Sequence, residues 1–433
     1  MTDKLLEISK TKKERVKAGI SRRRNKEARF RFYGIASILM AFTFLFVLIT
    51  TIVADGHTAF YTTQIRLDVS LDSDTLGVKE GETDPAIVSQ GSYRKALRNA
   101  LREEVSVDGR RDRRELYRFI SNGAEYDLRD IVTNNPELIG TTYTYWAQAG
   151  DNFNQYNKGN IRGDIPESSR QFKDKHIGWF DTLEADGRVR TVFNHHFFTN
   201  GDSRDPELAG IWGATVGSFY TLLVTLVLSF PIGVAAAIYL EEFAPRNRVT
   251  ELIEININNL AAVPSIVFGL LGLAVFLNVA DLPRSAPVVG GLVLTLMTLP
   301  TIIISSRAAI KAVPPSVRDA ALGVGASKMQ MVLHHVLPLA MPGMLTGTII
   351  GMAQALGETA PLLMIGMVAF IVEVPGGPLD AATALPVQIY LWAENPEKGF
   401  IENTSGAIMV LLAFLAFMNA VAVILRKRLE RRW

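Results

Sequence analysis

Six long apolar runs constrain this chain more than any other feature of its sequence. A helix of about 18 residues, rising 1.5 Å per residue, is long enough to cross roughly 30 Å of hydrocarbon. The runs cover residues 33–54, 211–240, 257–279, 286–306, 343–370 and 406–425. Because 20% of the 433 residues are charged, the chain cannot lie in a membrane throughout. The sequence therefore predicts an all-α polytopic membrane protein with six transmembrane helices and soluble parts between them.

Charges at the ends of these runs predict the orientation. Residues 1–32 hold 12 Lys or Arg against 4 Asp or Glu, directly before the first run, 33–54. The positive-inside rule places this basic tail in the cytoplasm. A cleaved signal peptide is the alternative, but the apolar run exceeds the usual core of about 7–15 residues and no clear cleavage site follows. Alternate crossings then place the basic tail 426–433 in the cytoplasm as well.

The segment between the first two runs, residues 55–208, falls outside the membrane on the opposite side. It contains 26 Asp or Glu against 20 Lys or Arg and no run that could span a bilayer. Alternation over Thr63–Leu71 predicts a strand, helical spacing predicts a helix over Tyr93–Val105, and Arg188–Phe198 is a second candidate strand. We therefore expect a periplasmic soluble domain here, of mixed α/β or α+β fold.

Several classes of site are not supported by the sequence. The chain has no cysteine, which excludes disulfides and thiolate chemistry. The segment 323–328 is the nearest approach to a phosphate-binding loop, but it lacks the Gly-Lys-Ser/Thr element. The adjacent histidines His195, His196, His334 and His335 have no carboxylate at Glu-x-x-His spacing. We accordingly predict no catalytic residue and no metal site.

The predicted cytoplasmic loop 307–338 contains two short helices joined at a glycine. Pro314–Ser316 begins the first helix, since proline is tolerated in the first turn and serine is a good cap. Gly325 supplies the left-handed residue that closes it. A second, amphipathic helix then runs from Met329 to Pro338, where it is expected to end.

The surface of this loop is suited to contact with another protein. The small side chains of Ala320 and Ala321 allow close approach, and Arg318 and Asp319 offer charges at the rim. The loop resembles the EAA coupling motif of binding-protein-dependent ABC importer permeases, in which it docks into a cleft of the ATPase subunit. The residues that match are Asp319, Ala320, Ala321, Gly325, Leu337 and Pro338. The family has Glu at the position of Asp319 and usually Ile at that of His335.

Three further stretches resemble the phosphate permeases of the PstA type. They are Asn259–Leu270, Gly357–Leu363 and Ala384–Tyr390, and the resemblance extends over essentially the whole membrane half. It implies a permease core of five helices over residues 209–425, with the helix 33–54 as an anchor for the domain that follows it. Some relatives of this type carry an N-terminal extension of the same kind.

Candidate residues for the translocation pathway or gate lie in and near these stretches. They are Pro264, Ser265, Arg307, Gln354, Glu358 and Thr359. Pro264 removes a backbone donor within a span and Ser265 offers a replacement, which suits either a helix lining a polar path or a simple packing kink. Arg307 is either an attractor of phosphate at the inner mouth or a topogenic residue that flanks a span.

Glu358 is an ionisable residue within an apolar run, and such a residue normally faces a cavity or a partner. A carboxylate repels phosphate, so we expect Glu358 to pair with a cation on a neighbouring helix or on a partner permease, with Pro361 breaking the helix just beyond. Phosphate-type relatives carry a basic residue where this chain has Gln354, which donates hydrogen bonds without charge.

The resemblance also implies partners and a mechanism. It implies three protein partners: a second permease subunit (PstC type), an ATPase subunit in two copies (PstB type) and a periplasmic phosphate-binding protein (PstS type). The chain itself would lie in the lipid bilayer of a bacterial inner (plasma) membrane. No nucleic acid is implied as a partner. This chain would bind no cofactor itself, since ATP and magnesium belong to the ATPase subunit. Inorganic phosphate would move by alternating access. The alternatives are an importer of sulfate or molybdate, and a membrane-anchored ligand sensor or scaffold.

Overall fold

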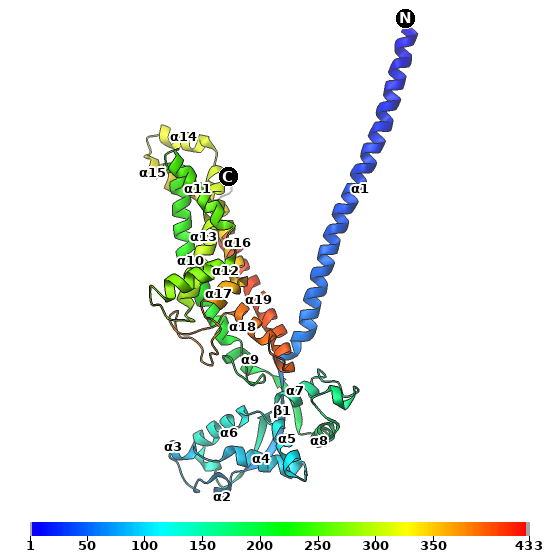
Figure 1. Cartoon of the computed structure of the whole chain (residues 1–433), viewed down its shortest axis with the longest axis vertical. Helices are drawn as coiled ribbons and strands as arrows, with labels where there is room; N and C mark the ends of the chain where they lie inside the picture. The colour runs from blue at the N-terminus through cyan, green and yellow to red at the C-terminus, as the bar shows by residue number, and fades with distance from the viewer. Residues whose placement is uncertain (1, 430–433) are drawn as a thin grey trace. The chain divides into compact units, whose positions relative to one another are not determined.

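The computed structural model describes residues 2–429, and the chain divides after Asp55 into two compact units. The first unit is a single helix, α1 (Thr2–Gly56), drawn in blue in Figure 1. Residues 2–32 of the expected basic tail and the first apolar run are therefore one continuous helix. Residues 430–433 of the second basic tail lie outside the described residues.

The second unit begins with what we call the α/β region, residues 61–199. Its three-stranded antiparallel sheet has the order β2-β1-β3, with β1 (Tyr61–Ser70) between β2 (Thr142–Gln148) and β3 (Val189–Phe193). Its helices are α2 (Ser73–Leu76), α3 (Pro85–Val88), α4 (Tyr93–Glu104), α5 (Arg110–Leu116), α6 (Gly123–Asn134), α7 (Asp151–Asn157), α8 (Asp174–Ala185) and α9 (His195–Thr199). The mixed α/β fold expected from the sequence is confirmed.

Alternation in β1 determines which face of the sheet is buried. Ile65, Leu67 and Val69 are fully buried and pack with Leu97 and Leu101 of α4. Buried residues recur at every second position in β1 and about every 3.6 positions in α4. These two periods are the signals that predicted the strand and the helix. The prediction of a strand over Arg188–Phe198 was right for β3 only. The predicted strand extends too far, because the Asn194 side chain accepts a hydrogen bond from Phe197 N at 3.3 Å and thereby caps the start of α9.

The rest of the second unit is a helical bundle. Its helices are α10 (Trp212–Ile238), α11 (Arg248–Ala261), α12 (Ser265–Gly272), α13 (Pro287–Lys311), α14 (Pro315–Gly323), α15 (Lys328–Met331), α16 (Leu337–Gly357), α17 (Ala360–Met364), α18 (Leu385–Ala393) and α19 (Lys398–Leu429). Within the described residues, five helices are long and apolar enough to cross a membrane, or six if one bent pair counts as a span. Within this unit, α14 and α15 lie at one end of the bundle and the α/β region at the other (Figure 1).

The third apolar run is not the continuous span expected over 257–279. It forms the bent pair α11 and the helix that begins at Ser265, with 101° between their axes. Pro264 caps α12 with φ −57° and ψ 137°, outside the helical region, and it has no N–H to continue the hydrogen-bond ladder. Proline therefore breaks the helix here instead of kinking it slightly.

The fifth run also differs from the span expected over 343–370. The helix begins earlier, continues through α16 and stops at Gly357, and the short α17 follows. Residues 368–384 form no helix. The apolar run therefore contains both the end of a membrane helix and a segment beyond it that packs in the bundle without continuing the helix.

Buried polar contacts join the α/β region to the start of α19. Lys158 Nζ lies 2.9 Å from Glu402 Oε1, and these two side chains are only 5% and 4% exposed. Gln155 donates a second hydrogen bond to the same carboxylate. Asn403 Nδ2 donates to the carbonyl oxygen of Pro206 at 2.8 Å. Charged groups that are buried and paired in this way fix the geometry of the junction.

Two carboxyl groups at this junction have raised pKa values. Burial raises the pKa of Glu207 to about 7. Burial, reinforced by the nearby carboxylates of Glu397 and Glu402, raises the pKa of Asp151 to about 6, although Lys158 opposes this shift. Both groups therefore hold a proton more tightly in the folded chain than in the unfolded one.

Stability is consequently expected to fall as the pH rises through this range. The contribution of the two groups is complete below about pH 4 and is lost as the pH passes through 6 and 7. The shift at Glu207 corresponds to on the order of 3 kcal/mol. We expect Glu207→Gln to flatten the pH dependence of the melting temperature in detergent between pH 5 and 8. Parallel curves for the two proteins would contradict this.

Candidate functional site

The loop between α13 and α16 is closed by a Schellman motif. Gly325 has φ +88°, and its N–H donates to the carbonyl oxygen of Leu322 at 3.0 Å. Ala326 N–H donates to the carbonyl oxygen of Ala321 at 3.1 Å, which completes the motif at the end of α14. No atom lies within 4 Å of a Cβ built on Gly325, so glycine is required by conformation and not by space. The left-handed residue predicted here is confirmed.

The capping residues differ from those expected. Pro314 is the N-cap of α14, and Ser316 lies inside the helix without a capping hydrogen bond, so its expected role is wrong. The serine cap is found at the second helix, where Ser327 and Gln330 form a reciprocal capping box. The second short helix is thus held at its first turn by a side-chain capping box, whereas α14 has no side-chain cap.

The second helix does not end at Pro338 as expected. α15 passes through a π turn, Val332–Val336, directly into α16. Proline has no N–H to donate, and the wider π turn shifts the hydrogen-bond register just before it. The result is one helix over Lys328–Gly357, which extends from the loop far into the bundle. The loop and this part of the bundle are therefore joined by one continuous helix.

The loop exposes several apolar side chains. Ala320 is exposed, but Ala321 is only 4% exposed and packs with Val313 and Val336, so only one of the two small residues offers a surface to a partner. Asp319 is exposed beside it. The exposed apolar side chains of the loop are Leu322 (46%), Val324 (86%), Met329 (54%) and Leu333 (45%). An apolar patch this exposed at a loop tip is typical of a protein–protein contact.

Arg318 has a structural role in the loop instead of the expected rim position. Its Nη2 lies 2.8 Å from Glu242 Oε1, and it also donates to the carbonyl oxygens of Val313 at 2.7 Å and Ile310 at 2.9 Å. The side chains of Arg318 and Glu242 are 20% and 8% exposed. The guanidinium thus ties α14 to the ends of α10 and α13.

A second ion-pair group holds the ends of three helices together. Arg307 Nη2 lies 2.7 Å from Glu254 Oε1, and Arg307 Nε lies 2.5 Å from Glu241 Oε1. Lys311 Nζ reaches Glu241 Oε1 at 3.3 Å. Because two carboxylates balance its charge, Arg307 fits the structural alternative better than the role of a free cation that attracts phosphate.

Sequence reasoning missed the three acidic partners in these groups. Glu241 and Glu242 follow directly after an apolar run, at an end where the positive-inside rule favours Lys and Arg. Acidic residues in that position require cationic partners nearby, so the sequence could have predicted that Glu241 and Glu242 form ion pairs. Glu254 had no such signal, because its contact with Arg307 depends on the bend between α11 and α12.

We expect the Arg318–Glu242 pair to stabilise the loop measurably. Arg318→Met leaves a nearly buried carboxylate without its partner and should lower the free energy of unfolding by roughly 3 kcal/mol. A double-mutant cycle with Glu242→Gln should give a coupling energy of about 1–3 kcal/mol in thermal or chemical unfolding in detergent. Additive effects of the two substitutions would contradict the assignment.

The two intramembrane stretches singled out in the sequence lie against each other. A Cβ built on Gly269 of α12 would lie 2.7 Å from Cα of Pro361 in α17. The absence of a side chain at Gly269 thus permits this close helix contact. Pro264 and Ser265 begin α12 on the same bent element, but Ser265 makes no capping hydrogen bond.

Glu358 marks the break in the fifth run. It is the C-cap of α16, with φ −77° and ψ 122°, so the helix ends there and not at Pro361, which lies in the first turn of α17. Glu358 is half-buried, and no cation of the described residues forms an ion pair with it. Gln354, four residues earlier and on the same helix face, is exposed. Thr359 follows at the N-cap of α17 and accepts the Leu363 N–H with its carbonyl oxygen.

Comparisons with known proteins extend over both halves of the chain. Residues 229–433 match the family model of the binding-protein-dependent transport system inner membrane component. Residues 17–167 match a domain of unknown function, DUF3333. The family match includes the loop 307–338 and the intramembrane stretches described above.

Curated relatives cover about half of this chain. The probable ABC transporter permease protein YqgI of Bacillus subtilis is 33% identical over 43% of this chain and 63% of its own length. This chain therefore covers less than two thirds of YqgI. The phosphate transport system permease protein PstA 1 of Mycobacterium tuberculosis is 30% identical over 52% of this chain and 72% of the relative. The phosphate transport system permease protein PstA of Haemophilus influenzae is 29% identical over 51% of this chain and 77% of its own length. The chain belongs to the family of binding-protein-dependent transport system inner membrane components.

Proposed function

We propose that this chain is the permease subunit of an importer that moves inorganic phosphate across the inner membrane. Family membership makes it a multi-pass, non-catalytic permease component of a bacterial ABC importer, in which ATP is hydrolysed by a separate subunit. The observation that supports phosphate is the similarity to relatives named as phosphate permeases over half of the chain. The proposed partners are a PstC-type permease, two copies of a PstB-type ATPase and a PstS-type binding protein.

In this proposal the loop that carries Gly325 couples ATP hydrolysis to transport. Its exposed apolar side chains, with Ala320 and Asp319, would dock on the ATPase subunit. Closure of two ATPase subunits would move the loop, and the continuous helix Lys328–Gly357 would carry the movement to the break at Glu358. The positions of the loop and the α/β region at opposite ends of the bundle support a cytoplasmic loop and a periplasmic α/β region (Figure 1). The basic tails would then lie in the cytoplasm by the positive-inside rule.

The face that carries Gln354 and Glu358 is proposed to form part of the gate. It offers a neutral donor and a carboxylate without a cation partner in the described part of the chain, so the partner permease would supply the opposing surface. A carboxylate at a gate repels a free anion unless it is paired. We therefore assign Glu358 to pairing across the permease interface and not to contact with the transported anion.

Stimulation of ATP hydrolysis tests the substrate assignment. The complete assembly in lipid, with its binding protein, is assayed with phosphate, sulfate or molybdate. Stimulation by phosphate, with little effect of equal concentrations of the other anions, is the expected result. Stimulation by sulfate or molybdate alone would show that the importer moves another anion and would contradict the assignment of phosphate. Failure of any ATPase to associate through the loop would favour the sensor or scaffold reading.

A further inference from the structure

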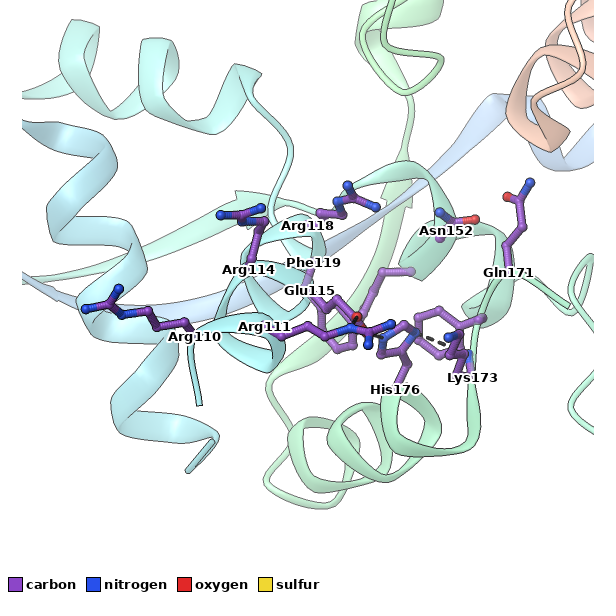
Figure 2. A pocket seen from close by; sticks show the side chains of 12 residues that line it. Arg110, Arg111, Arg114, Glu115, Arg118, Phe119, Asn152, Gln171, Lys173 and His176 are labelled. Atoms are coloured by element: carbon purple, nitrogen blue, oxygen red, sulfur yellow. Dashed lines mark hydrogen bonds and ion pairs between the residues drawn. The ribbon is translucent and has the colours of Figure 1, made fainter. Parts of the chain in front are cut away.

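A strongly basic cavity of about 590 Å³ lies in the α/β region, between α5, α7 and the start of α8. Figure 2 shows its lining from close by. The cationic side chains at the cavity are Arg110, Arg111, Arg114, Arg118 and Lys173. The residues that line this cavity include one carboxylate, that of Glu115. Cations gathered at this density repel each other unless an anion lies among them.

Three arginines of this cavity have no carboxylate partner in the described part of the chain. Among the described residues, Arg110, Arg114 and Arg118 form no ion pair, and Arg114 and Arg118 project from the same side of the chain in Figure 2. Elsewhere in the region, five arginines pair with carboxylates, namely Arg94 with Glu125, Arg129 with Asp130, Arg162 with Asp164, Arg170 with Asp174, and Arg188 with Asp68 and Glu104. The cavity therefore brings together several guanidinium groups whose charge no carboxylate of the described residues balances.

The one carboxylate in the cavity does not neutralise these arginines. Glu115 Oε2 lies 2.5 Å from Lys175 Nζ and 3.0 Å from His176 Nε2, and its Oε1 lies 3.3 Å from Nε of Arg111. The hydrogen bond from Lys175 and that from His176 lower the pKa of Glu115 to about 2. Its charge is thus engaged by Lys175 and His176, leaving Arg114 and Arg118 available.

A second cavity of about 1110 Å³ adjoins the first and shares its arginines. It adds Arg98 and Arg113, and it shares Asn152 with the first cavity. Arg113 Nε and Asn152 Oδ1 are buried without a hydrogen-bond partner among the described residues. Buried polar atoms are normally satisfied, and of these two the Arg113 Nε–H is a donor, which fits a ligand that accepts hydrogen bonds. Asn152 Oδ1 needs a donor and does not bear on an anionic ligand. The second cavity is also lined by the carboxyl groups of Asp151, Asp205, Glu207 and Glu397, so the first cavity is the more strongly basic of the two.

The floor of the first cavity is aromatic. Phe119 and Phe172 stack with ring centroids 5.6 Å apart, and the ring of His176 lies edge-on to Phe119 at 6.0 Å. These rings hold the basic segment on a rigid base. Arginine forks recognise phosphate oxygens bidentately, and a site with several of them favours several phosphate groups over one.

We propose that this cavity binds a compound that carries two or more linked phosphate groups, held chiefly by Arg114 and Arg118. The combined cavities are far larger than one orthophosphate ion, and their arginines extend along the wall instead of converging on one point. The site lies apart from the coupling loop and from the gate. The proposal therefore does not depend on which anion the permease transports.

Direct binding tests this proposal on the full chain in detergent micelles. Calorimetric titration with tripolyphosphate at low salt is expected to show binding that Arg114→Gln/Arg118→Gln weakens at least tenfold. The matched control, Arg129→Gln/Arg162→Gln, removes the same charge from arginines that are paired and should stay within twofold of wild type. Tripolyphosphate should also raise the melting temperature of wild type and control but not of the cavity variant.

Several results would overturn the proposal. Equal affinity in both double variants would show a non-specific charge effect, and no binding to wild type would exclude the site. Orthophosphate or sulfate binding as tightly as tripolyphosphate would contradict the requirement for linked phosphates. Binding only to nanodiscs of phosphatidylglycerol, without affinity for tripolyphosphate, would assign the arginines to a membrane surface. Because no transport is measured, none of these results bears on the proposed phosphate import.

Discussion

Replacing Lys158 with Met is expected to lower the free energy of unfolding by about 3–5 kcal/mol, because it leaves the carboxylate of Glu402 buried without a cation. Both side chains are at most 5% exposed, so water cannot solvate the remaining charge. Gln155 stays as a hydrogen-bond donor but brings no charge. The change is measured as a loss of melting temperature in detergent and as earlier proteolysis between the α/β region and the bundle.

The second substitution in this pair distinguishes an ion pair from simple packing. Lys158→Met/Glu402→Gln removes both charges and should recover much of the lost stability, since an uncharged pair leaves no buried charge. A matched surface control is Arg162→Met, which breaks an exposed pair with Asp164 and should change nothing measurable. If Lys158→Met behaved like this control, the buried pair would not hold the junction.

Replacing Gly325 with Val is expected to reduce ATP-dependent uptake at least tenfold. A β-branched residue at φ +88° is strained by more than the roughly 1–2 kcal/mol of an ordinary left-handed residue. Relief of the strain breaks the Schellman motif and changes the angle between α14 and α15, which displaces the apolar face proposed to dock on the ATPase. Uptake of labelled phosphate by proteoliposomes measures the loss.

Asparagine provides the matched control at the same position. Gly325→Asn adds a side chain of similar size, but asparagine adopts the left-handed conformation readily. No atom lies within 4 Å of the added Cβ, so its uptake should stay within twofold of wild type. Equal loss in both variants would show that the loop tolerates no side chain at all, and equal uptake would show that the glycine conformation is not needed for coupling.

Local patterns predicted the parts of this structure that depend on neighbouring residues. The alternation in β1, the helical spacing in α4 and the left-handed Gly325 all arise from backbone preferences over a few positions. Apolar length located the membrane helices because every backbone group in a bilayer must be satisfied within the protein. These features required no knowledge of the tertiary fold.

Features that depend on distant residues could not be predicted in this way. Lys158 and Glu402 are separated by 244 positions, and no periodicity links them. Composition alone did not distinguish a full span from the 101° bend at Pro264, because broken and continuous apolar runs have the same hydropathy. The end of α16 at Glu358 was placed three residues late for a related reason, since Pro361 looked like the stronger helix breaker and instead begins α17.

The partners of the ionisable loop residues were only partly accessible from the sequence. Arg307 and Arg318 were recognised as charges near a membrane end, but a free cation and a paired one look alike in a sequence. Glu241 and Glu242 could have resolved this, because acidic residues next to an apolar run normally have cationic partners. The structure places both arginines in ion pairs and leaves the exposed loop face largely apolar.

The most direct test of the proposed function is uptake of labelled phosphate by proteoliposomes that contain the complete assembly and its binding protein. With ATP on the side of the ATPase subunits, phosphate is expected to accumulate above its external concentration, and a non-hydrolysable ATP analogue should abolish this accumulation. An intact assembly that hydrolyses ATP in response to another anion, and moves no phosphate, would contradict the account.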